Sequence, residues 1–352
     1  MNPLNFFSYL PFFLRKKFTE KYIIIESDDW GLERALSVDS INYLRNKYGE
    51  NKFSRWTFDS LETSDDLNEL FGLLENFKNK FEHPPIITAN FITHNIDYSD
   101  KENLNFIPIS KGFNIESEDV RNIYKQGIRD KHIFPQLHGY SHYNLARLRK
   151  YFFTEEGMEA SGQKFLGGRS TIRGNFSFLQ GEMSEENSES DKIKDAAEEF
   201  NNFFGFYSKS VIPPAFIFDL RIMNLLKENN IALIQSSNRL ISTMKRRYGF
   251  PYFQKRKGFY WSVRNARLDP HPEYKFNHEQ CLKSIEKSFE NKSPAVIDFH
   301  RVNFAGRYNP QYRNRTIKEL KLLFDNIYKK WPDTKFIHSQ KLYEILWQQE
   351  TK

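Results

Sequence analysis

The stretch KYIIIESDDWG, residues 21–31, sets an apolar run directly against two adjacent acids and decides how the rest of the chain is interpreted. Its three isoleucines predict a strand buried on both faces, as in a parallel sheet covered by helices. Asp28 and Asp29 follow within the same stretch. Two carboxylates after a strand most often cap the next helix, but they can also divide a chemical task between them. The other strand ends have to decide between these alternatives.

Short apolar segments recur along the chain between longer segments with helical spacing. The predicted strands span residues 22–27, 85–91, 132–138, 211–218, 231–236, 258–263, 295–300 and 335–339. The predicted helices include residues 36–49, 64–80, 278–292 and 315–332. This alternation predicts the α/β class and a distorted (β/α)7-type barrel in a single domain, with a doubly wound open sheet as the main alternative. Residues 143–190 fit the alternation poorly, so we expect an elaborated loop there, over one end of the barrel.

The composition restricts the kinds of site that the protein can hold. Cys281 is the single cysteine, which excludes an intramolecular disulfide and a cysteine-based metal site. A metal ion would therefore need histidine and carboxylate ligands. The net charge of +7 favours anionic partners in general. No zinc-finger, RNA-recognition or basic-helix pattern is present, so we expect no nucleic-acid partner.

The barrel domain, residues 21–352, is expected to follow an apolar and basic N-terminal tail, residues 1–20. The tail is apolar first and basic afterwards, the reverse of a secretory signal. Residues 1–18 either pack against the barrel or lie on a membrane surface with Arg15, Lys16 and Lys17 at the headgroups. We expect a cytoplasmic protein, with contact at the inner face of the membrane as the alternative. The oligomeric state is left open.

Groups suited to metal binding and acid–base chemistry gather where the predicted strands end. In barrel enzymes the working residues sit at the C-terminal ends of the strands. QLHGYSHYN places His138 and His142 four residues apart, where both imidazoles can reach one ion, although one packed and one exposed histidine is the simpler alternative. In VIDFHRVNF, Asp298 and His300 share one face of a strand, which suits a site or a hydrogen-bonded structural histidine.

The order of these motifs over residues 22–300 resembles the polysaccharide deacetylase family of carbohydrate esterases. That family removes acetyl groups from sugars with a divalent metal, commonly zinc, on a distorted barrel. HRVNF, residues 300–304, is also similar to a subgroup associated with bacterial surface-polysaccharide biosynthesis. The resemblance implies an acetylated sugar or glycan as substrate, N-acetyl in preference to O-acetyl, in surface polysaccharide or glycolipid biosynthesis.

Carried onto this chain, the resemblance implies Asp29, His138 and His142 as metal ligands, with Zn²⁺ the expected ion. It implies Asp28 as general base and His300 as general acid. Two histidines and one carboxylate would leave a position for water, as catalytic zinc sites do. A backbone N–H near Ala215 or Phe216 would help to stabilise the oxyanion.

The chain departs from the family pattern at one catalytic position. The arginine expected ahead of Pro213 is replaced by Ile212. Arg264 in WSVRNARLDP is the expected substitute for holding the base, with Arg301 as the second choice. The acid that orients His300 is Asp298 or Asp269.

Further residues are candidates for contact with the substrate. Trp30 either stacks on a sugar or fills the top of the barrel, and His94 either contacts substrate or is structural. Phe216, Asp298 and Arg301 complete the predicted substrate contacts.

Two other functions compete with deacetylation. A metal-assisted glycosidase on a similar barrel would need a second carboxylate, from Glu26 or from an acid in residues 143–190. A non-catalytic glycan-binding relative would not need the base Asp28.

Overall fold

The computed structural model describes residues 16–49, 58–100, 102–115, 120–164, 179–237, 240–241, 247–248, 252–271 and 276–350. Most of the expected tail, residues 1–15, lies outside these ranges, as does the middle of the expected loop, residues 165–178. Within the described residues, no helix combines the length and the hydropathy needed to cross a bilayer.

One large sheet organises the described part of the chain. Its strands are β1 (Tyr22–Trp30), β2 (Ile87–Ile92), β5 (Ile133–Gly139), β6 (Ser210–Val211), β7 (Leu233–Ser236), β10 (Lys255–Arg256), β11 (Phe259–Val263), β12 (Ala266–Arg267), β13 (Ala295–His300) and β14 (Lys335–Phe336). Their order is β10-β11-β7-β6-β5-β2-β1-β13-β12, and β14 pairs with β1. Every pair is parallel except β10 with β11.

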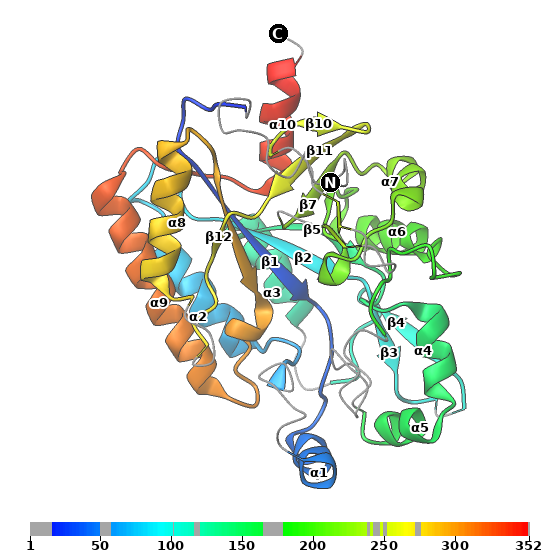
Figure 1. The fold of residues 1–352 in the computed structure, drawn as a ribbon. Helices are drawn as coiled ribbons and strands as arrows, with labels where there is room; N and C mark the ends of the chain where they lie inside the picture. Colours follow the sequence, from blue (N-terminus) through cyan, green and yellow to red (C-terminus); the bar gives the residue numbers. More distant parts are fainter. Residues whose placement is uncertain are drawn as a thin grey trace.

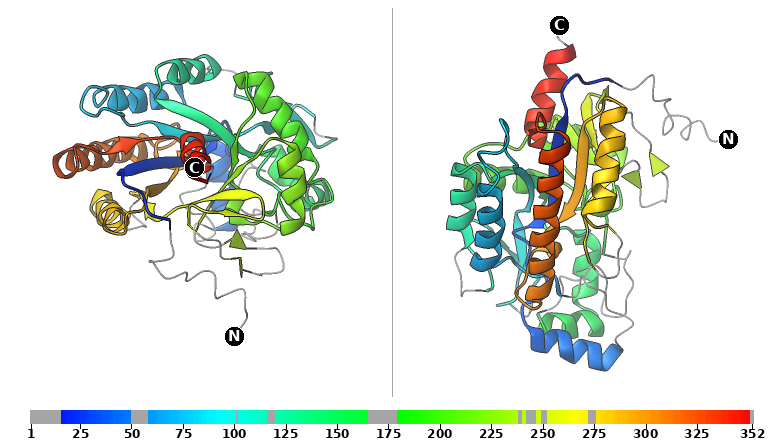
Figure 2. Two further views of the ribbon diagram at one scale, coloured as in Figure 1. Left: turned by 90° about the horizontal axis from the view of Figure 1, so that it is seen from above. Right: turned by 90° about the vertical axis from the view of Figure 1, so that its left-hand side faces the viewer.

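The strand order follows the chain around a curled sheet, as it does in a barrel (Figure 2). From β1 the order runs through β2, β5, β6 and β7 to β11, and β13 returns to the other side of β1. A doubly wound sheet would reverse direction at a switch point. Among the described residues β11 and β12 do not pair, so the sheet curls without closing. The predicted α/β barrel-type class is confirmed, with a seam between these two strands.

Helices surround the sheet on its outer side, except that the C-terminal helix lies at the end of the curl, near the middle of the view from above (Figures 1 and 2). They are α1 (Val38–Tyr48), α2 (Ser64–Glu75), α3 (Val120–Arg129), α4 (Leu145–Phe152), α5 (Glu155–Gly162), α6 (Lys192–Phe204), α7 (Met223–Glu228), α8 (His278–Glu290), α9 (Pro310–Lys330) and α10 (Ser339–Glu350). Two small hairpins stand apart from the sheet: β3 (His94–Asp97) with β4 (Asn105–Pro108), and β8 (Leu240–Ile241) with β9 (Arg247–Tyr248).

Capping boxes start α2 at Thr63 and α8 at Asn277. In α9 the apolar face at Leu320, Leu323, Phe324 and Ile327 is buried as its spacing predicts.

The alternation of β1 separates two cores. Ile23 and Ile25 pack in the larger cluster beneath the helices, whereas Ile24 packs in a smaller cluster with Leu233 and Val296. Helix α10 contributes Leu342 and Leu346 to this smaller cluster. Burial of each such side chain stabilises the fold by about 1.5–3 kcal/mol. The even-numbered residues of β1 therefore point into the curl of the sheet, where Glu26 and Asp28 continue the row that Ile24 begins.

Residues 143–190 contain more regular structure than the expected loop. Helices α4 and α5 occupy 145–152 and 155–162, and Asn144 and Thr154 cap their N-termini. The side chains of these two cap residues accept hydrogen bonds from the backbone N–H groups of Arg147 and Gly157, which a loop would leave to water.

Candidate metal and catalytic site

The backbone at the end of β1 makes its two aspartates point in different directions. Asp29 has a positive φ of 71°, and the pairing of β1 with β2 shifts register between Ser27 and Trp30. Such a bulge re-aims the side chains that follow it. Asp28 stays in register opposite His300 on β13. The strand therefore presents Asp28 to one set of partners and Asp29 to another.

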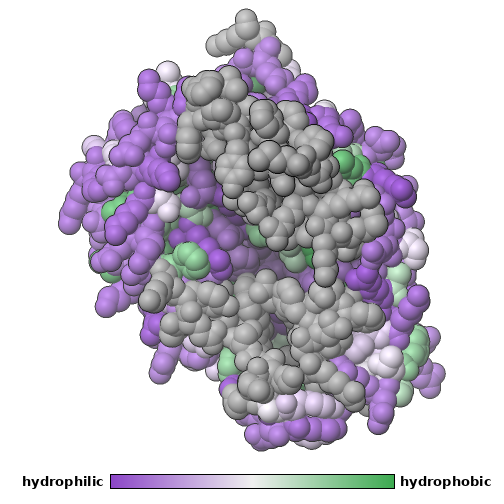
Figure 3. Space-filling view, viewed as in Figure 1, coloured by the Kyte–Doolittle hydropathy of each residue, from purple (hydrophilic) through white to green (hydrophobic). Residues whose placement is uncertain are grey.

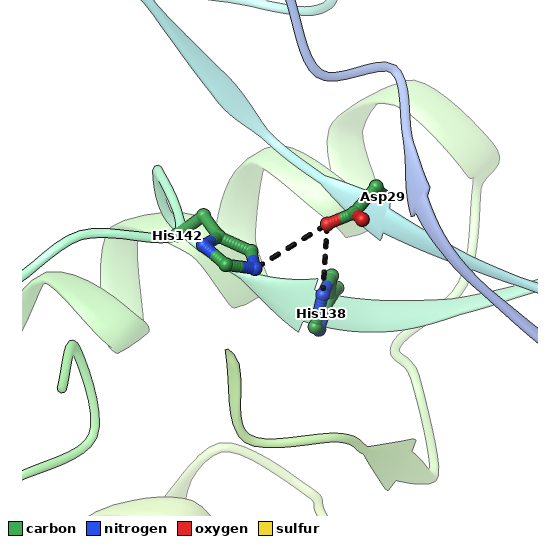
Figure 4. A group of neighbouring side chains, drawn as sticks. All are labelled: Asp29, His138 and His142. Carbon is green, nitrogen blue, oxygen red and sulfur yellow. Dashed lines mark ion pairs between the residues drawn. The ribbon is translucent and has the colours of Figure 1, made fainter. Parts of the chain in front are cut away.

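Asp29, His138 and His142 converge at the C-terminal ends of β1 and β5 (Figure 4). Asp29 Oδ1 lies 3.4 Å from His138 Nε2 and 3.3 Å from His142 Nε2. Ligands about 2.0–2.1 Å from a tetrahedral zinc ion are separated by about 3.3 Å, so the three atoms fit one such ion. All three side chains are buried. The structure thus brings together the three predicted metal ligands.

The two histidines are held by groups behind them. His138 Nδ1 lies 3.0 Å from the carbonyl oxygen of Ile212, which sets the tautomer that leaves Nε2 unprotonated. Glu182 accepts backbone N–H bonds from Tyr140, Ser141 and His142 at 2.6, 3.0 and 2.6 Å. His142 also has a positive φ, 77°, which this carboxylate helps to maintain. The His138 ring and the backbone that carries His142 are therefore held in place by other parts of the chain.

Arg34 lies on the other side of Asp29. Its Nη2 is 3.3 Å from Asp29 Oδ1, and its Nε is 2.6 Å from Asp59 Oδ2. Burial alone would raise the pKa of Asp29, but the charge of Arg34 and the two histidines holds it well below its ordinary value. Asp29 is therefore a carboxylate at neutral pH, the form that binds a metal.

Asp28 is hydrogen-bonded by Arg264, which lies in the short connection after β11. Arg264 donates from Nη2 to Asp28 Oδ1 at 2.6 Å and from Nη1 to Oδ2 at 2.8 Å. Asn90 adds a bond to Oδ1 at 2.8 Å. Burial would raise the pKa of Asp28, but Arg264 and the nearby imidazoles bring it below its ordinary value. The predicted substitute arginine thus lies where a missing base-holding arginine would be needed.

His300 and Asp298 lie close to Asp28 and Arg264. His300 Nε2 lies 3.8 Å from Asp28 Oδ2, and its Nδ1 lies 3.9 Å from Asp298 Oδ1. Arg264 Nη1 donates to Asp298 Oδ1 at 2.6 Å. Asp298 is therefore the acid beside His300. Asp269, the other acid considered for this position, is bonded by Arg267 at 2.6 Å.

Two predicted substrate residues are placed elsewhere. Trp30 is fully buried in the larger core, where it packs on Phe91 and Phe304, because the bulge at Asp29 turns it away from the curl of the sheet. Arg301 is also fully buried and pairs with Asp59 at 2.9 Å and Glu62 at 3.2 Å. Neither side chain has surface for a sugar, and Arg301 does not substitute for the missing arginine. These two predictions are corrected.

His94 and Phe216 have mixed outcomes. The His94 ring stacks on Tyr140, with centroids 3.9 Å apart, and burial lowers its pKa to about 4, which favours the structural alternative. The Phe216 ring faces Arg264, whose guanidinium carbon is 5.6 Å from the ring centroid. The Phe216 N–H bonds the Pro213 carbonyl at 2.9 Å, so it is not an oxyanion donor. Ala215, with a positive φ of 55°, remains the candidate donor.

Sequence reasoning missed several supporting residues. Arg34 pairs with Asp29, and Glu182 accepts the backbone N–H of His142. Asn90, which lies in the predicted strand 85–91 but was given no role, donates to Asp28. Glu26 was considered only as a possible second carboxylate, and it instead bonds Arg264, Ser262 and Ser339. The signal for Asn90 and Glu26 lay in their positions, because each is a polar residue inside a buried strand.

The acids available for a glycosidase mechanism are committed elsewhere. Glu26 is fully buried, and burial raises its pKa against the opposing effect of Arg264. Glu182 is buried and saturated by three backbone N–H groups. Because Glu26 and Glu182 are buried and bonded to other groups, neither is free to serve as the second carboxylate of a glycosidase.

Comparisons with known proteins bear on the fold. No protein-family model matches the chain, and no curated protein matches it. A 4-alpha-glucanotransferase structure from Thermococcus litoralis matches with 11% identity and a TM-score of 0.46, over 94% of this chain and 40% of that one. This chain therefore spans well under half of the glucanotransferase.

Other solved structures are similar over almost the whole of both chains. A putative polysaccharide deacetylase from Mycobacterium smegmatis matches with 9% identity and a TM-score of 0.44, over 94% of this chain and 92% of that one. A family 4 acetyl xylan esterase from Clostridium thermocellum, in complex with cobalt, matches with 9% identity and a TM-score of 0.40, over 92% and 91%. Because every one of these TM-scores is below 0.5, we base the function on the site and not on these likenesses.

Proposed function

We propose that the protein is a metal-dependent deacetylase of a carbohydrate, acting on N-acetyl in preference to O-acetyl groups. The observation that carries this proposal is that the neighbouring residues Asp28 and Asp29 have different partners. Asp29 meets two imidazoles at 3.3 and 3.4 Å, while Asp28 is held by an arginine and an asparagine. One carboxylate is placed to bind an ion and the next to take a proton beside it.

The residues around the site supply complementary acid and base groups. A divalent metal held by Asp29, His138 and His142 would polarise an acetyl carbonyl and lower the pKa of water. Asp28, ionised at neutral pH, would accept the proton of the attacking water. His300, between Asp28 and Asp298, would donate a proton to the leaving nitrogen. The Ala215 N–H is the backbone group proposed to stabilise the developing oxyanion.

The finer parts of the proposal rest on the sequence. Zinc is the proposed ion because two histidines and one carboxylate suit it, although cobalt, nickel and manganese accept the same ligands. We also propose that residues 21–352 form one catalytic domain, which acts in surface-polysaccharide or glycolipid biosynthesis. The proposed location is the cytoplasm, and the alternative is contact with the inner face of the membrane through residues 1–18.

The first test measures bound metal by elemental analysis in protein purified without a histidine tag. About one ion per chain is expected in the wild type and in His83→Ala, whose ring is 48% exposed and outside the site. His138→Ala should lose the ion. Absence of metal from the wild type, even after addition of Zn²⁺ and dialysis, would overturn the proposal.

The second test measures acetate released from N-acetylated hexosamine oligomers and from O-acetylated xylan oligomers. Asp28→Asn should keep the metal and lose about 10²–10⁴-fold in rate, because it removes the proton acceptor and leaves the three metal ligands in place. An Asp28→Asn variant with wild-type rate would exclude Asp28 as the base.

A further inference from the structure

A groove lies at the seam of the sheet. The connection from β11 to β12 consists of two residues, Arg264 and Asn265, which leaves no room for a covering helix. A cavity of about 770 Å³ opens beside it, between β12 and α8. In the view of Figure 3 hydrophilic surface is visible in a hollow near the middle of the same face that shows α8 and β12 in Figure 1. The volume is in the range of small-molecule sites.

One wall of the groove is a polar face of α8. The groove-lining residues of this helix and its end recur with helical spacing: Gln280, Ser284, Lys287, Ser288 and Asn291. The apolar residues Cys281 and Ile285 turn instead toward the core. A merely uncovered strand would expose apolar side chains to water. Here hydroxyl, amide and ammonium groups stand beside the apolar surface of Tyr252, Ala266 and Phe276, which suits a ligand with both kinds of surface, such as a sugar.

The inner end of the groove reaches the catalytic network. Arg264 and Asp298 both line it, and both belong to the hydrogen-bonded group around Asp28. Phe276 lies at the mouth, with its side chain 37% exposed and the Arg267 guanidinium 4.4 Å from its ring centroid. An aromatic ring beside hydroxyl and amide groups offers an apolar surface to the ring of a sugar.

The charged residues that line the groove indicate which charge its ligand should carry. Three cations, Arg264, Arg267 and Lys287, line it against one carboxylate, Asp298. Arg264 is paired with carboxylates inside the sheet and Arg267 with Asp269, so the cation left for a ligand is Lys287, an exposed ammonium on the groove wall. A cation in this position attracts an anionic group on the ligand.

We infer that this groove binds an acidic sugar unit, one that carries a phosphate or a carboxylate, in the non-reacting part of the substrate. The inference rests on the proposed function for its link to catalysis, because it places a further sugar next to Arg264 and Asp298. The binding itself follows from the groove and does not require the metal.

The test measures binding by isothermal titration calorimetry of the full chain with three matched probes: glucose 1-phosphate, glucuronic acid and neutral glucose. At least one acidic probe should bind more tightly than glucose, and the stronger of the two identifies phosphate or carboxylate as the preferred group. Lys287→Gln should weaken that binding about fivefold, as expected for loss of one exposed charge pair. Lys283→Gln, an exposed lysine of α8 that does not line the groove, should leave it unchanged.

The same titrations in the metal-free His138→Ala variant separate this inference from the proposed function. Selective binding without acetate release from any substrate would refute the deacetylase and keep the groove. Acetate release with equal binding of glucose and the acidic probes, or with no binding, would refute the groove alone. Equal weakening by Lys287→Gln and Lys283→Gln would also overturn it, because the effect would then be one of overall charge.

Discussion

Replacing Arg264 with glutamine removes a cation that three carboxylates share inside the sheet. The guanidinium bonds Glu26 at 3.0 Å, Asp28 at 2.6 and 2.8 Å, and Asp298 at 2.6 Å. The side chain of Arg264 is 2% exposed and that of Glu26 is fully buried. Loss of the cation would leave these acids close together, away from water and without their partner.

The expected cost is about 4 kcal/mol of unfolding free energy, within the roughly 3–5 kcal/mol found when one partner of a buried ion pair is removed. The figure is lower than the sum over four charge-assisted bonds, at about 1.5–3 kcal/mol each, because Glu26 can take up a proton. Burial already raises the pKa of Glu26 against the effect of Arg264, so that proton would bind readily in the variant. Arg264→Lys should lose less, since an ammonium keeps the charge but cannot form the fork to Asp28.

Urea unfolding at pH 7, followed by circular dichroism, measures this effect in the wild type and both variants. Arg221→Gln is the control, because Arg221 is 83% exposed and its pair with Glu185 should contribute less than about 1 kcal/mol. An Arg264→Gln variant within about 1 kcal/mol of the wild type would show that the carboxylates do not depend on this arginine. The reasoning about how Asp28 is held would then fail as well.

Three further predictions concern the metal ligands, their support and the acid range. Adding Zn²⁺ to metal-stripped protein should raise the melting temperature of the wild type and not that of His138→Ala, because binding to the folded state alone stabilises it; an equal rise in both would contradict the triad. Glu182→Gln removes the charge that accepts three backbone N–H bonds, so it should weaken Zn²⁺ binding about 10–100-fold in a chelator competition, and unchanged affinity would exclude a positioning role. Burial lowers the pKa of both His94 and His338 to about 4, so each stabilises the fold above its unfolded pKa of about 6.5 and loses that contribution as the pH falls. Lowering the pH from 7 to 5 should reduce the free energy of unfolding by about 2 kcal/mol for each of these two histidines. In urea titrations at both pH values, His338→Asn should show a decrease that is smaller by about 2 kcal/mol.

The parts of the fold and site that the sequence predicted are those that local patterns determine. Apolar runs with β-branched residues marked the strands, and β1, β5 and β13 formed where their segments predicted. Because parallel strands align their C-terminal ends, residues at those ends had to meet. Arg264 could be proposed for the same reason, since it follows directly on a predicted strand.

The parts that could not be predicted depend on local backbone geometry and on distant partners. Trp30 could not be placed from the sequence because the register shift between Ser27 and Trp30 turns its side chain into the larger core. Arg301 was misplaced because a short 3-10 turn, Arg301–Asn303, carries it into the core toward Asp59. Glu182 lies 42 residues from Tyr140 in the sequence, and only the folded chain brings them together.

The pairing of β1 has a consequence for how the protein is made. This strand is synthesised well before two of its partners, β13 and β14, which begin at residues 295 and 335. Contacts over such sequence separations slow folding, because a long loop must close before they form. Until β13 has been synthesised, the edge of β1 that pairs with it stays unpaired and can associate with other chains. Removal of residues 333–352 would take away both β14 and α10 (Ser339–Glu350), and with them one partner of β1 and part of the smaller core.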